Sequence, residues 1–459
     1  MLQAASNRTF DEIQIGDSAT MTKAPNRDDI ALFAVLTGDE NPTHLEGKLG
    51  DGAQISAHGM WGASLLSALL GNELPGPGTV YRRQDLSFER PLLLGDRLTA
   101  SIRASEKRLD GHIVIFDCRG VNQRGETVFT GRAEVAAPTD RIEHSRIALP
   151  EIRIRRHEKW DRLIGAAMAL GPLPTAVVYP CDAFSMSATI EAAGAGILQP
   201  ILVGPIDRMR ALAEAAGGDI YHFECIDAAD ARTAAEAAVA RVREGGAKAI
   251  MKGSLHTDEL LHAVVAKGTG LRGTRRMSHC FVMDVPGHDD VLIISDAAVN
   301  IAPDLEAKVD IVQNAIDLAL ALNIEPRVAI LSAIETVNPK IQSTVDAAAL
   351  SKMADRGQIK GGSVDGPFAF DNAINLEAAK IKGVTSAVAG HANVLIVPDL
   401  ESGNMLAKNL TFLAGADASG IVLGARVPVI LTSRADSVRA RLASAALASL
   451  FDRHTAFSL

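Results

Sequence analysis

The feature that most constrains the fold is the regular alternation of short apolar runs with helical segments from Trp160 to the C-terminus. The runs are aliphatic and nearly continuous, as expected for strands that are covered on both faces. They are Ala176–Tyr179, Ile201–Val203, Ala249–Met251, Cys280–Val285, Val291–Ser295, Val328–Leu331, Val394–Val397 and Val427–Leu431. Helical patterns lie between them, most clearly at Ala231–Glu244, Leu305–Leu322 and Leu442–Leu450. The pattern predicts a layered α/β domain with a largely parallel sheet.

The first part of the chain has a different pattern. One long apolar helix candidate, about Ala57–Leu70, is followed by four longer strand candidates, Thr79–Phe88, Arg97–Lys107, His112–Val121 and Thr127–Ala136. Short polar turns between the last strands favour an antiparallel meander. We therefore expect an α+β domain in which the sheet wraps around one central helix and buries Leu65, Leu66, Leu69 and Leu70.

With 459 residues the chain is too long for one ordinary core. Residues 139–158, between the two patterns, are charge-rich, contain one proline and have no clear amphipathic period. We interpret them as a linker between a first domain, residues 1–138, and a second domain, residues 159–459.

Composition excludes several classes of protein. The net charge of −9 and the lack of a long Lys/Arg block argue against nucleic-acid binding. The four scattered cysteines have no metal-ligand spacing, and no GxGxxG motif opens a helix after a strand. The first residues lack a signal pattern, and no apolar run approaches about 20 residues. We expect a cytoplasmic protein with reduced thiols, no bound metal and no membrane partner.

Asp39 and His44 form the first candidate site. Gly38 and Asn41-Pro42 end the preceding helix and turn the chain, so the carboxylate and the imidazole can converge on one water molecule. Hydration of a conjugated thioester needs a base that activates water and an acid that protonates the α-carbon. The spacing alone favours the plainer interpretation, a turn aspartate and a surface histidine.

Three ordered motifs extend this observation: GDENPTHLE, AHGMWGASLLSALLG and LPGPGTVYRRQDLSFERPLLLGDRLTA. Over roughly residues 8–137 the chain resembles the MaoC-like, (R)-specific enoyl-CoA hydratases, which have a hotdog fold. The resemblance implies that Asp39 and His44 are the catalytic pair and that the Gly59 N–H faces the thioester oxygen, where a helix N-terminus stabilises enolate charge. Ser67 matches a polar position of the family, although a small residue that eases helix packing explains it equally well.

A second candidate site follows from the strand ends of the α/β domain, where open parallel sheets bind ligands. The last apolar run leads directly into Ser433, Arg434 and Asp436 before a helix begins. A guanidinium can bind phosphate through two hydrogen bonds, and a helix N-terminus adds N–H donors. From these residues alone, ordinary helix capping by Ser433 or Asp436 is the favoured interpretation.

Six further motifs keep one order over roughly residues 160–455: MKGSLHTDELL, GLRGTRRMSHCFVMDVP, ETVNPKIQSTVDAAAL, VDGPFAFDNAI, AGHANVLIVPDLESGNMLAKNL and VPVILTSRADS. They resemble the phosphate acetyl/butyryltransferase family, and the TSRADS and ETVNPK segments look closer to its butyryl branch. The resemblance implies that Arg434 binds phosphate and that Ser433 stabilises the tetrahedral intermediate or the thiol. The acetyl branch has a catalytic aspartate further on, where this chain has Val438–Arg441, so we assign Asp436 as the base.

Other positions are expected to contact the substrate. Lys252 and Gly253 end a strand, and Lys252 suits a phosphate contact. Gly403 and Asn404 are expected to open a helix beside a strand end, which suits close approach of a phosphate or of the pantetheine of coenzyme A. Together the two resemblances imply a bifunctional, homo-oligomeric enzyme. It would use coenzyme A thioesters and inorganic phosphate as substrates, with no bound cofactor.

Two alternatives remain open at this point. In one, the hotdog domain is a non-catalytic module for coenzyme A binding or dimerisation, joined to an active transferase. In the other, the α/β domain has become a sensor of coenzyme A or acyl phosphate, because the distal aspartate is missing.

Overall fold

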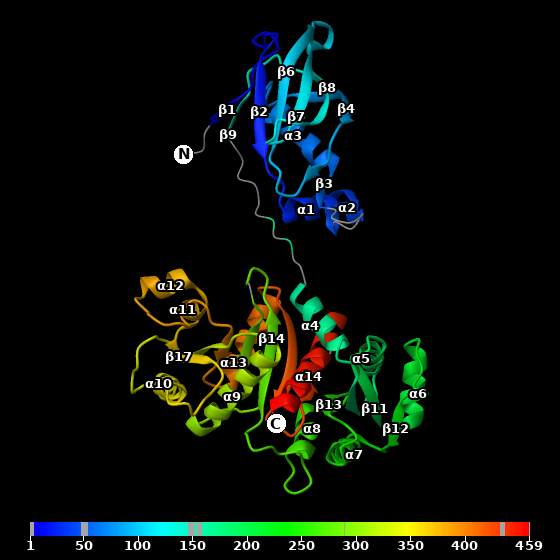
Figure 1. Cartoon of the computed structure of the whole chain (residues 1–459), viewed down its shortest axis with the longest axis vertical. Helices are drawn as coiled ribbons and strands as arrows, with labels where there is room; N and C mark the ends of the chain where they lie inside the picture. The colour runs from blue at the N-terminus through cyan, green and yellow to red at the C-terminus, as the bar shows by residue number, and fades with distance from the viewer. Residues whose placement is uncertain are drawn as a thin grey trace. The chain divides into compact units, whose positions relative to one another are not determined.

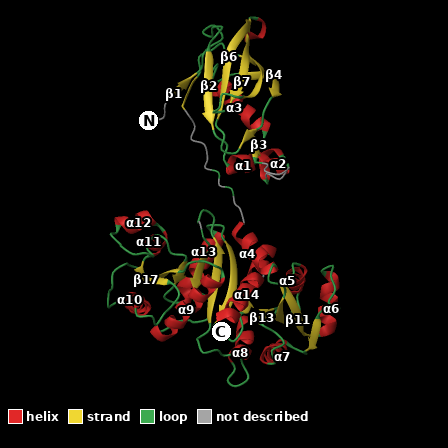
Figure 2. Ribbon diagram, viewed as in Figure 1, coloured by secondary structure: helices red, strands yellow, loops and turns green. Residues whose placement is uncertain are grey.

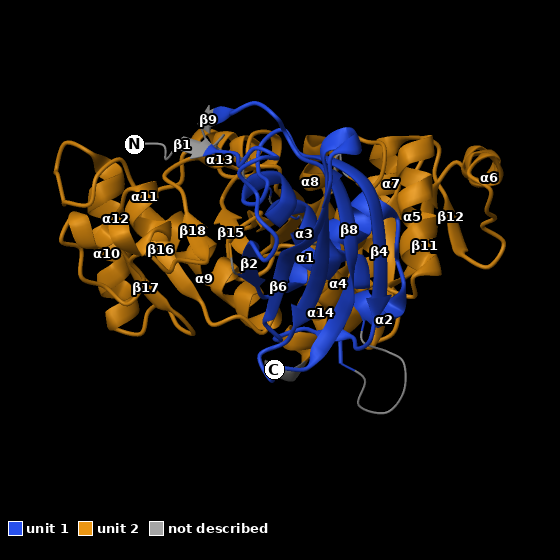
Figure 3. Ribbon diagram, turned by 90° about the horizontal axis from the view of Figure 1, so that it is seen from above, with its two compact units in different colours: residues 1–155 blue, residues 156–459 orange. Residues whose placement is uncertain are grey.

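The computed structural model describes residues 4–46, 54–145, 152, 154, 158–288, 290–431 and 437–458. The chain divides into two compact units, residues 1–155 and 156–459, which Figure 3 colours separately. The division falls within the stretch 139–158 that the sequence suggests as a linker. Part of that stretch, Glu143–Ser145, forms strand β9 and pairs antiparallel with β1, Ala4–Ser6. The proposed domain limits therefore stay predictions.

The first unit is built on a five-stranded antiparallel sheet with the order β2-β6-β7-β8-β4. Its strands are β2 (Ser18–Lys23), β4 (Val80–Phe88), β6 (Leu98–Arg108), β7 (Ile113–Val121) and β8 (Thr127–Ala136). Helix α3, Gly59–Asn72, packs against this sheet (Figure 1). The shorter elements are α1 (Arg27–Thr37), α2 (Pro42–Leu45), β3 (Ser56–Ala57), β5 (Leu92–Leu93) and the 3-10 turn Asp110–His112.

The core of this unit lies between α3 and the sheet. Leu65, Leu66, Leu69 and Leu70 are all buried, as the sequence predicts, and they belong to one cluster with Phe116 and Phe129 of the sheet. Burying a leucine side chain stabilises the fold by about 1.5–3 kcal/mol. The antiparallel sheet around a central helix is thus confirmed.

The second unit contains an eleven-stranded sheet with the order β12-β11-β10-β13-β20-β19-β14-β15-β18-β16-β17. Its strands are β10 (Leu173–Val178), β11 (Leu198–Gly204), β12 (Glu224–Asp227), β13 (Ala249–Lys252), β14 (Ser278–Asp284), β15 (Leu292–Ser295), β16 (Arg327–Leu331), β17 (Ser363–Phe368), β18 (Val394–Ile396), β19 (Asp417–Leu423) and β20 (Val429–Leu431). Its helices are α4 (Glu158–Met168), α5 (Ala183–Gly194), α6 (Ile206–Ala215), α7 (Ala231–Arg243), α8 (Thr257–Val265), α9 (Leu305–Ala321), α10 (Gln342–Asp355), α11 (Phe370–Ile374), α12 (Leu376–Ile381), α13 (Leu400–Phe412) and α14 (Val438–Ser458).

Helices cover both faces of this sheet (Figure 2). Successive strand residues point to opposite faces. Val177 of β10 belongs to one buried cluster with residues of α4, α5, α9 and α14, whereas its neighbours Ala176 and Val178 belong to another with residues of α7 and α8. On the far half of the sheet, Leu395 of β18 belongs to a third cluster with residues of α11, α12 and α13. Two covered faces explain why the strands appear in the sequence as continuous apolar runs.

The sheet is mostly parallel, as predicted, but its two halves run in opposite directions. The pairs β20-β19, β19-β14 and β14-β15 are antiparallel, whereas β13 is parallel to β20 and β15 is parallel to β18. Three reversals separate β13 from β18. The carboxyl end of β13 therefore lies at the opposite edge of the sheet from the carboxyl end of β18.

His279 of β14 is a buried titratable group at the centre of this sheet. Its side chain packs against the Phe281 ring, and its Nδ1 has no hydrogen-bond partner in the described chain. Burial lowers the pKa of His279 to about 4, against the opposing influence of the Asp296 carboxylate. The imidazole is therefore neutral in the folded unit at neutral pH.

Acid should destabilise the second unit through this residue. An unfolded histidine binds a proton below its ordinary pKa of 6.5, whereas His279 in the folded unit stays neutral until about pH 4. Stability is therefore complete above pH 6.5 and should fall by about 2 kcal/mol between about pH 7 and pH 5. Urea unfolding should give a shallower pH dependence for His279→Gln than for the wild type. Identical slopes would contradict this assignment.

Candidate active sites

The turn after α1 places Asp39 at the first candidate site. Helix α1 ends at Gly38, whose φ of 75° is the left-handed conformation that glycine adopts without strain. Asn41 then caps α2, and its side chain accepts the Thr43 N–H. The Asp39 carboxylate accepts the Asn41 N–H at 3.2 Å and is about half exposed, with 48% of its side-chain surface accessible. A partly exposed carboxylate can meet both water and a substrate.

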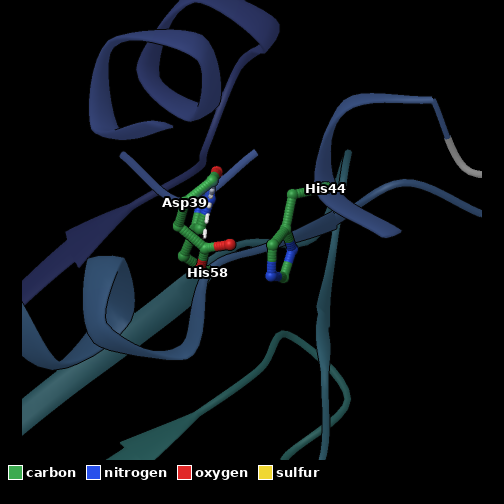
Figure 4. A group of neighbouring side chains, drawn as sticks. All are labelled: Asp39, His44 and His58. Carbon is green, nitrogen blue, oxygen red and sulfur yellow. Dashed lines mark hydrogen bonds and ion pairs between the residues drawn. The ribbon is translucent and has the colours of Figure 1, made fainter. Parts of the chain in front are cut away.

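His44 lies on α2 with its ring directed toward Asp39 (Figure 4). Its Nδ1 is 2.8 Å from the Ser56 carbonyl oxygen. A carbonyl can only accept, so Nδ1 carries the proton and Nε2 is left for chemistry. The structure thus brings the two predicted residues together, and the ligand atoms of Asp39, His44 and a third residue, His58, all lie within 4.8 Å of one another.

His58 is the residue of this site that the sequence reasoning missed. It is the residue before α3, it is buried, and its ring lies 4.0 Å from the His44 ring between centroids. Its Nε2 is 3.2 Å from the Asp39 backbone oxygen and 3.8 Å from the Asp39 carboxylate. The one signal available was its place directly before Gly59 in the AHGMWG motif.

Gly59 and Ser67 differ in their relation to this group. Gly59 is the first residue of α3 and follows His58, so its N–H belongs to the first turn and has no helical carbonyl to bind. Ser67 is exposed and lies eight residues further, about 12 Å along the helix axis. The structure therefore places Gly59 beside the Asp39 group and Ser67 away from it. Their roles stay predictions.

The same three side chains could in principle hold a metal ion, because two imidazoles and one carboxylate are common ligands. Two observations disfavour this. His58 Nε2 already donates to the Asp39 carbonyl, and binding a metal there would move the proton to Nδ1. In the described chain Nδ1 is buried without a partner, so its proton would have no acceptor. The arrangement fits an acid–base site better.

The second candidate site follows strand β20. Ser433, Arg434 and Asp436 lie outside the described residues, since 432–436 separate the end of β20 from Ser437. Strand β13 pairs in parallel with β20 up to Met251↔Ile430, so Lys252 and Gly253 leave the sheet at the same edge as the end of β20. Lys252 Nζ donates to the carbonyl oxygens of Gly253 and Leu255.

Gly253 is required by close packing of the backbone. A Cβ at this position would lie 2.3 Å from the Val178 oxygen and 2.5 Å from the Tyr179 oxygen. Ser254 Oγ donates to the Tyr179 oxygen and accepts the Cys181 N–H. The ends of β10 and β13 are therefore packed together at the sheet edge where β20 also ends.

The sequence suggested that Gly403 and Asn404 open a helix. The structure instead places both residues inside α13. The helix begins at Leu400 and is capped by Asp399, which accepts the Ser402 N–H. A Cβ on Gly403 would lie 2.8 Å from the Asp296 oxygen, and Asn404 Nδ2 donates to the Ala297 oxygen at 3.3 Å. Both residues thus pack against the loop that follows β15.

This position separates the four predicted binding residues into two pairs. Lys252 and Gly253 lie at the carboxyl end of β13, whereas Gly403 and Asn404 lie near the carboxyl ends of β15 and β18, at the opposite edge of the sheet. The structure does not bring the two pairs together through the strand ends. The role of each pair in substrate binding stays a prediction.

The stretch Val438–Arg441 forms the first turn of α14. Arg441 is nearly buried, pairs with Glu191 of α5 at 2.8 Å and packs over the Phe184 ring. It therefore fixes the start of α14 against α5, which positions the residue that follows 432–436.

No helix in the described ranges is both long enough and apolar enough to cross a bilayer.

Comparison with known proteins identifies both parts of the chain. Residues 228–449 match the family described as phosphate acetyl/butaryl transferase, and residues 7–115 match the MaoC like domain. A phosphate acetyltransferase of Rhizobium meliloti is 63% identical over 294 residues, which are 64% of this chain and 93% of that protein. A phosphate butyryltransferase of Clostridium beijerinckii is 42% identical over 64% of this chain and 97% of its own length.

A solved structure supports the fold of the second unit. A branched-chain phosphotransacylase from Enterococcus faecalis V583 is 27% identical, with a TM-score of 0.53, over 61% of this chain and 99% of that chain. The chain belongs to the phosphate acetyl/butyryltransferase family and carries a MaoC-like hotdog domain at its N-terminus.

Proposed function

We propose that the chain is a bifunctional enzyme whose two units both act on coenzyme A thioesters. The second unit transfers an acyl group between coenzyme A and inorganic phosphate, and the first hydrates a trans-2-enoyl-CoA to an (R)-3-hydroxyacyl-CoA. The identity of 63% with a phosphate acetyltransferase carries the first activity. The convergence of Asp39 and His44 in a MaoC-like domain carries the second.

The identity levels favour acetyl over butyryl as the transferred group. The TSRADS and ETVNPK segments look closer to the butyryl branch, yet the acetyltransferase is 63% identical and the butyryltransferase 42%. We therefore propose acetyl-CoA as the preferred substrate of the second unit. A homo-oligomer, expected from both resemblances, remains part of the proposal.

In the transferase reaction, a phosphate oxygen attacks the thioester carbonyl and forms a tetrahedral intermediate. The C–S bond then breaks, which gives acyl phosphate and the coenzyme A thiolate, and the thiolate takes up a proton. Arg434 would hold the phosphate dianion through its fork of N–H donors. Ser433 would donate to the developing oxyanion, and Asp436 would accept the proton of the attacking phosphate and pass it to the departing thiolate.

In the hydration, Asp39 takes a proton from water while the oxygen of that water bonds to C3. The Gly59 N–H stabilises the enolate oxygen that results, and Asp39 passes the proton to the free Nε2 of His44. His44 then gives this Nε2 proton to C2, which restores the starting state. The proton on His44 Nδ1, donated to the Ser56 oxygen, fixes which nitrogen takes part.

Asp39→Asn should abolish the hydration alone. The amide keeps the shape of the carboxylate but cannot take a proton, so kcat for crotonyl-CoA should fall by about 10²–10⁴-fold. Loss of the ultraviolet absorbance of the conjugated thioester measures this rate. Phosphate-dependent release of coenzyme A from acetyl-CoA should be unchanged. An inactive wild type with an active transferase would instead support a non-catalytic hotdog module.

Arg434→Ala should abolish the transfer alone. Loss of the phosphate-binding guanidinium should lower the phosphate-dependent release of coenzyme A by about 10²–10³-fold. Arg439→Ala is the matched control, because Arg439 pairs with Asp161 of α4 near the start of the same helix. A thiol reagent follows the released coenzyme A. Equal loss in both variants, or tight coenzyme A binding by an inactive wild type, would contradict the proposed transfer.

A further inference from the structure

Four consecutive residues, Ser56–Gly59, connect every group that the proposed hydration uses. The Ser56 carbonyl accepts the His44 Nδ1 proton, the His58 ring stacks on the His44 ring, and Gly59 begins α3. His58 also reaches Asp39 across 19 positions of the sequence. This segment therefore sets the geometry between the acid–base pair and the N-terminus of α3.

The hydrogen bonds of His58 determine its tautomer. The Asp39 backbone oxygen can only accept, so the contact at 3.2 Å requires a proton on His58 Nε2. His58 Nδ1 is buried and has no partner among the described residues, so a second proton there would have no acceptor. His58 is thus a neutral donor, unlike His44, which keeps its proton on Nδ1.

The position of Asp39 depends on this donor. Its other hydrogen bonds in the described chain are local: its N–H donates to Thr37 Oγ1 at 3.3 Å, and its carboxylate accepts the Asn41 N–H. Both belong to the same exposed turn and cannot fix it against α3. The His58 ring itself is held between Phe33 and His44, with centroids at 5.0 and 4.0 Å.

We propose that His58 is a positioning residue for the hydration, which holds Asp39 at a fixed distance from His44 and from the first turn of α3. This inference rests on the proposed hydratase function. His58 exchanges no proton with the substrate. It acts by donating one hydrogen bond to the Asp39 carbonyl and by lying beside its carboxylate.

Two substitutions separate the donor from the ring. His58→Phe keeps the stack with Phe33 and His44 but removes the N–H, whereas His58→Gln loses the ring but keeps an N–H at a similar reach. Misplacement of a catalytic group by about 1 Å can cost about 100-fold in rate. We expect His58→Phe to lower kcat for crotonyl-CoA by about 10–100-fold with KM changed less than about 3-fold. His58→Gln should recover most of the rate.

The outcomes distinguish this inference from the proposed function. If the wild type fails to hydrate crotonyl-CoA, the proposed hydratase function fails and the role of His58 with it. If the wild type is active and His58→Phe is equally fast, only the inference is overturned. The same holds if His58→Gln is as slow as His58→Phe. An unchanged unfolding transition of the first unit, followed by circular dichroism, reports that each variant is folded.

A measurement without turnover tests the tautomers directly. Nuclear magnetic resonance of the chain labelled with ¹⁵N in its histidines should report a protonated Nε2 for His58 and a protonated Nδ1 for His44. A proton on His58 Nδ1 would overturn the inference, whatever the activity.

Discussion

Strand direction in the eleven-stranded sheet determines where the transferase unit can carry out chemistry. Loops that leave parallel strands gather at one edge of a sheet, and three antiparallel pairs in the middle of this sheet create two such edges. Strand β20, which precedes Ser433 and Arg434 in the sequence, ends at the same edge of the sheet as Lys252 and Gly253. The start of α14 is fixed by the partly buried ion pair of Arg441 and Glu191. The proposed phosphate site therefore belongs to the edge formed by β10, β13 and β20.

In the hotdog unit, the question is how a surface turn holds Asp39 in a fixed position. In its proposed acid–base pair, Asp39 lies on an exposed turn with few restraints of its own, and His44 lies on the short helix α2. The proposed answer is a single long-range donor, His58, attached to the first turn of a helix whose leucines are buried in the core. In this proposal the buried helix fixes the position of the surface turn that carries Asp39. The same helix start carries the Gly59 N–H. The first turn of α3 would therefore set the positions of Asp39, His44 and this N–H relative to one another.

Much of the fold could be predicted from the sequence, because periodicity reports which faces are buried. The central helix, four strands of the first unit and eight strands of the second follow directly from it. Strands β12 and β17 escaped notice because they are edge strands with polar or proline-containing sequences, Glu224–Asp227 and Ser363–Phe368. Strand β19 begins Asp-Ala-Ser-Gly, which does not look like a strand. The apolar runs favour a largely parallel sheet, but they do not reveal the three antiparallel pairs in its middle.

The candidate sites were predictable where a motif carried them. Asp39 and His44 converge as the resemblance implies, whereas His58 was missed because helix caps are usually recognised by Ser, Thr, Asp or Asn. Gly403 looked like an open site for a ligand, but its missing Cβ leaves room for the Asp296 backbone.

The central claim is that one chain has two separate pockets for the thioester of coenzyme A. A crystal structure with a saturated acyl-CoA, in buffer free of phosphate, tests it most directly, because such a ligand can be neither hydrated nor transferred. The account predicts one thioester between Asp39, His44 and the Gly59 N–H, and a second beside Lys252 and the connection that follows β20. A ligand at only one of these places, or at neither, would contradict the account.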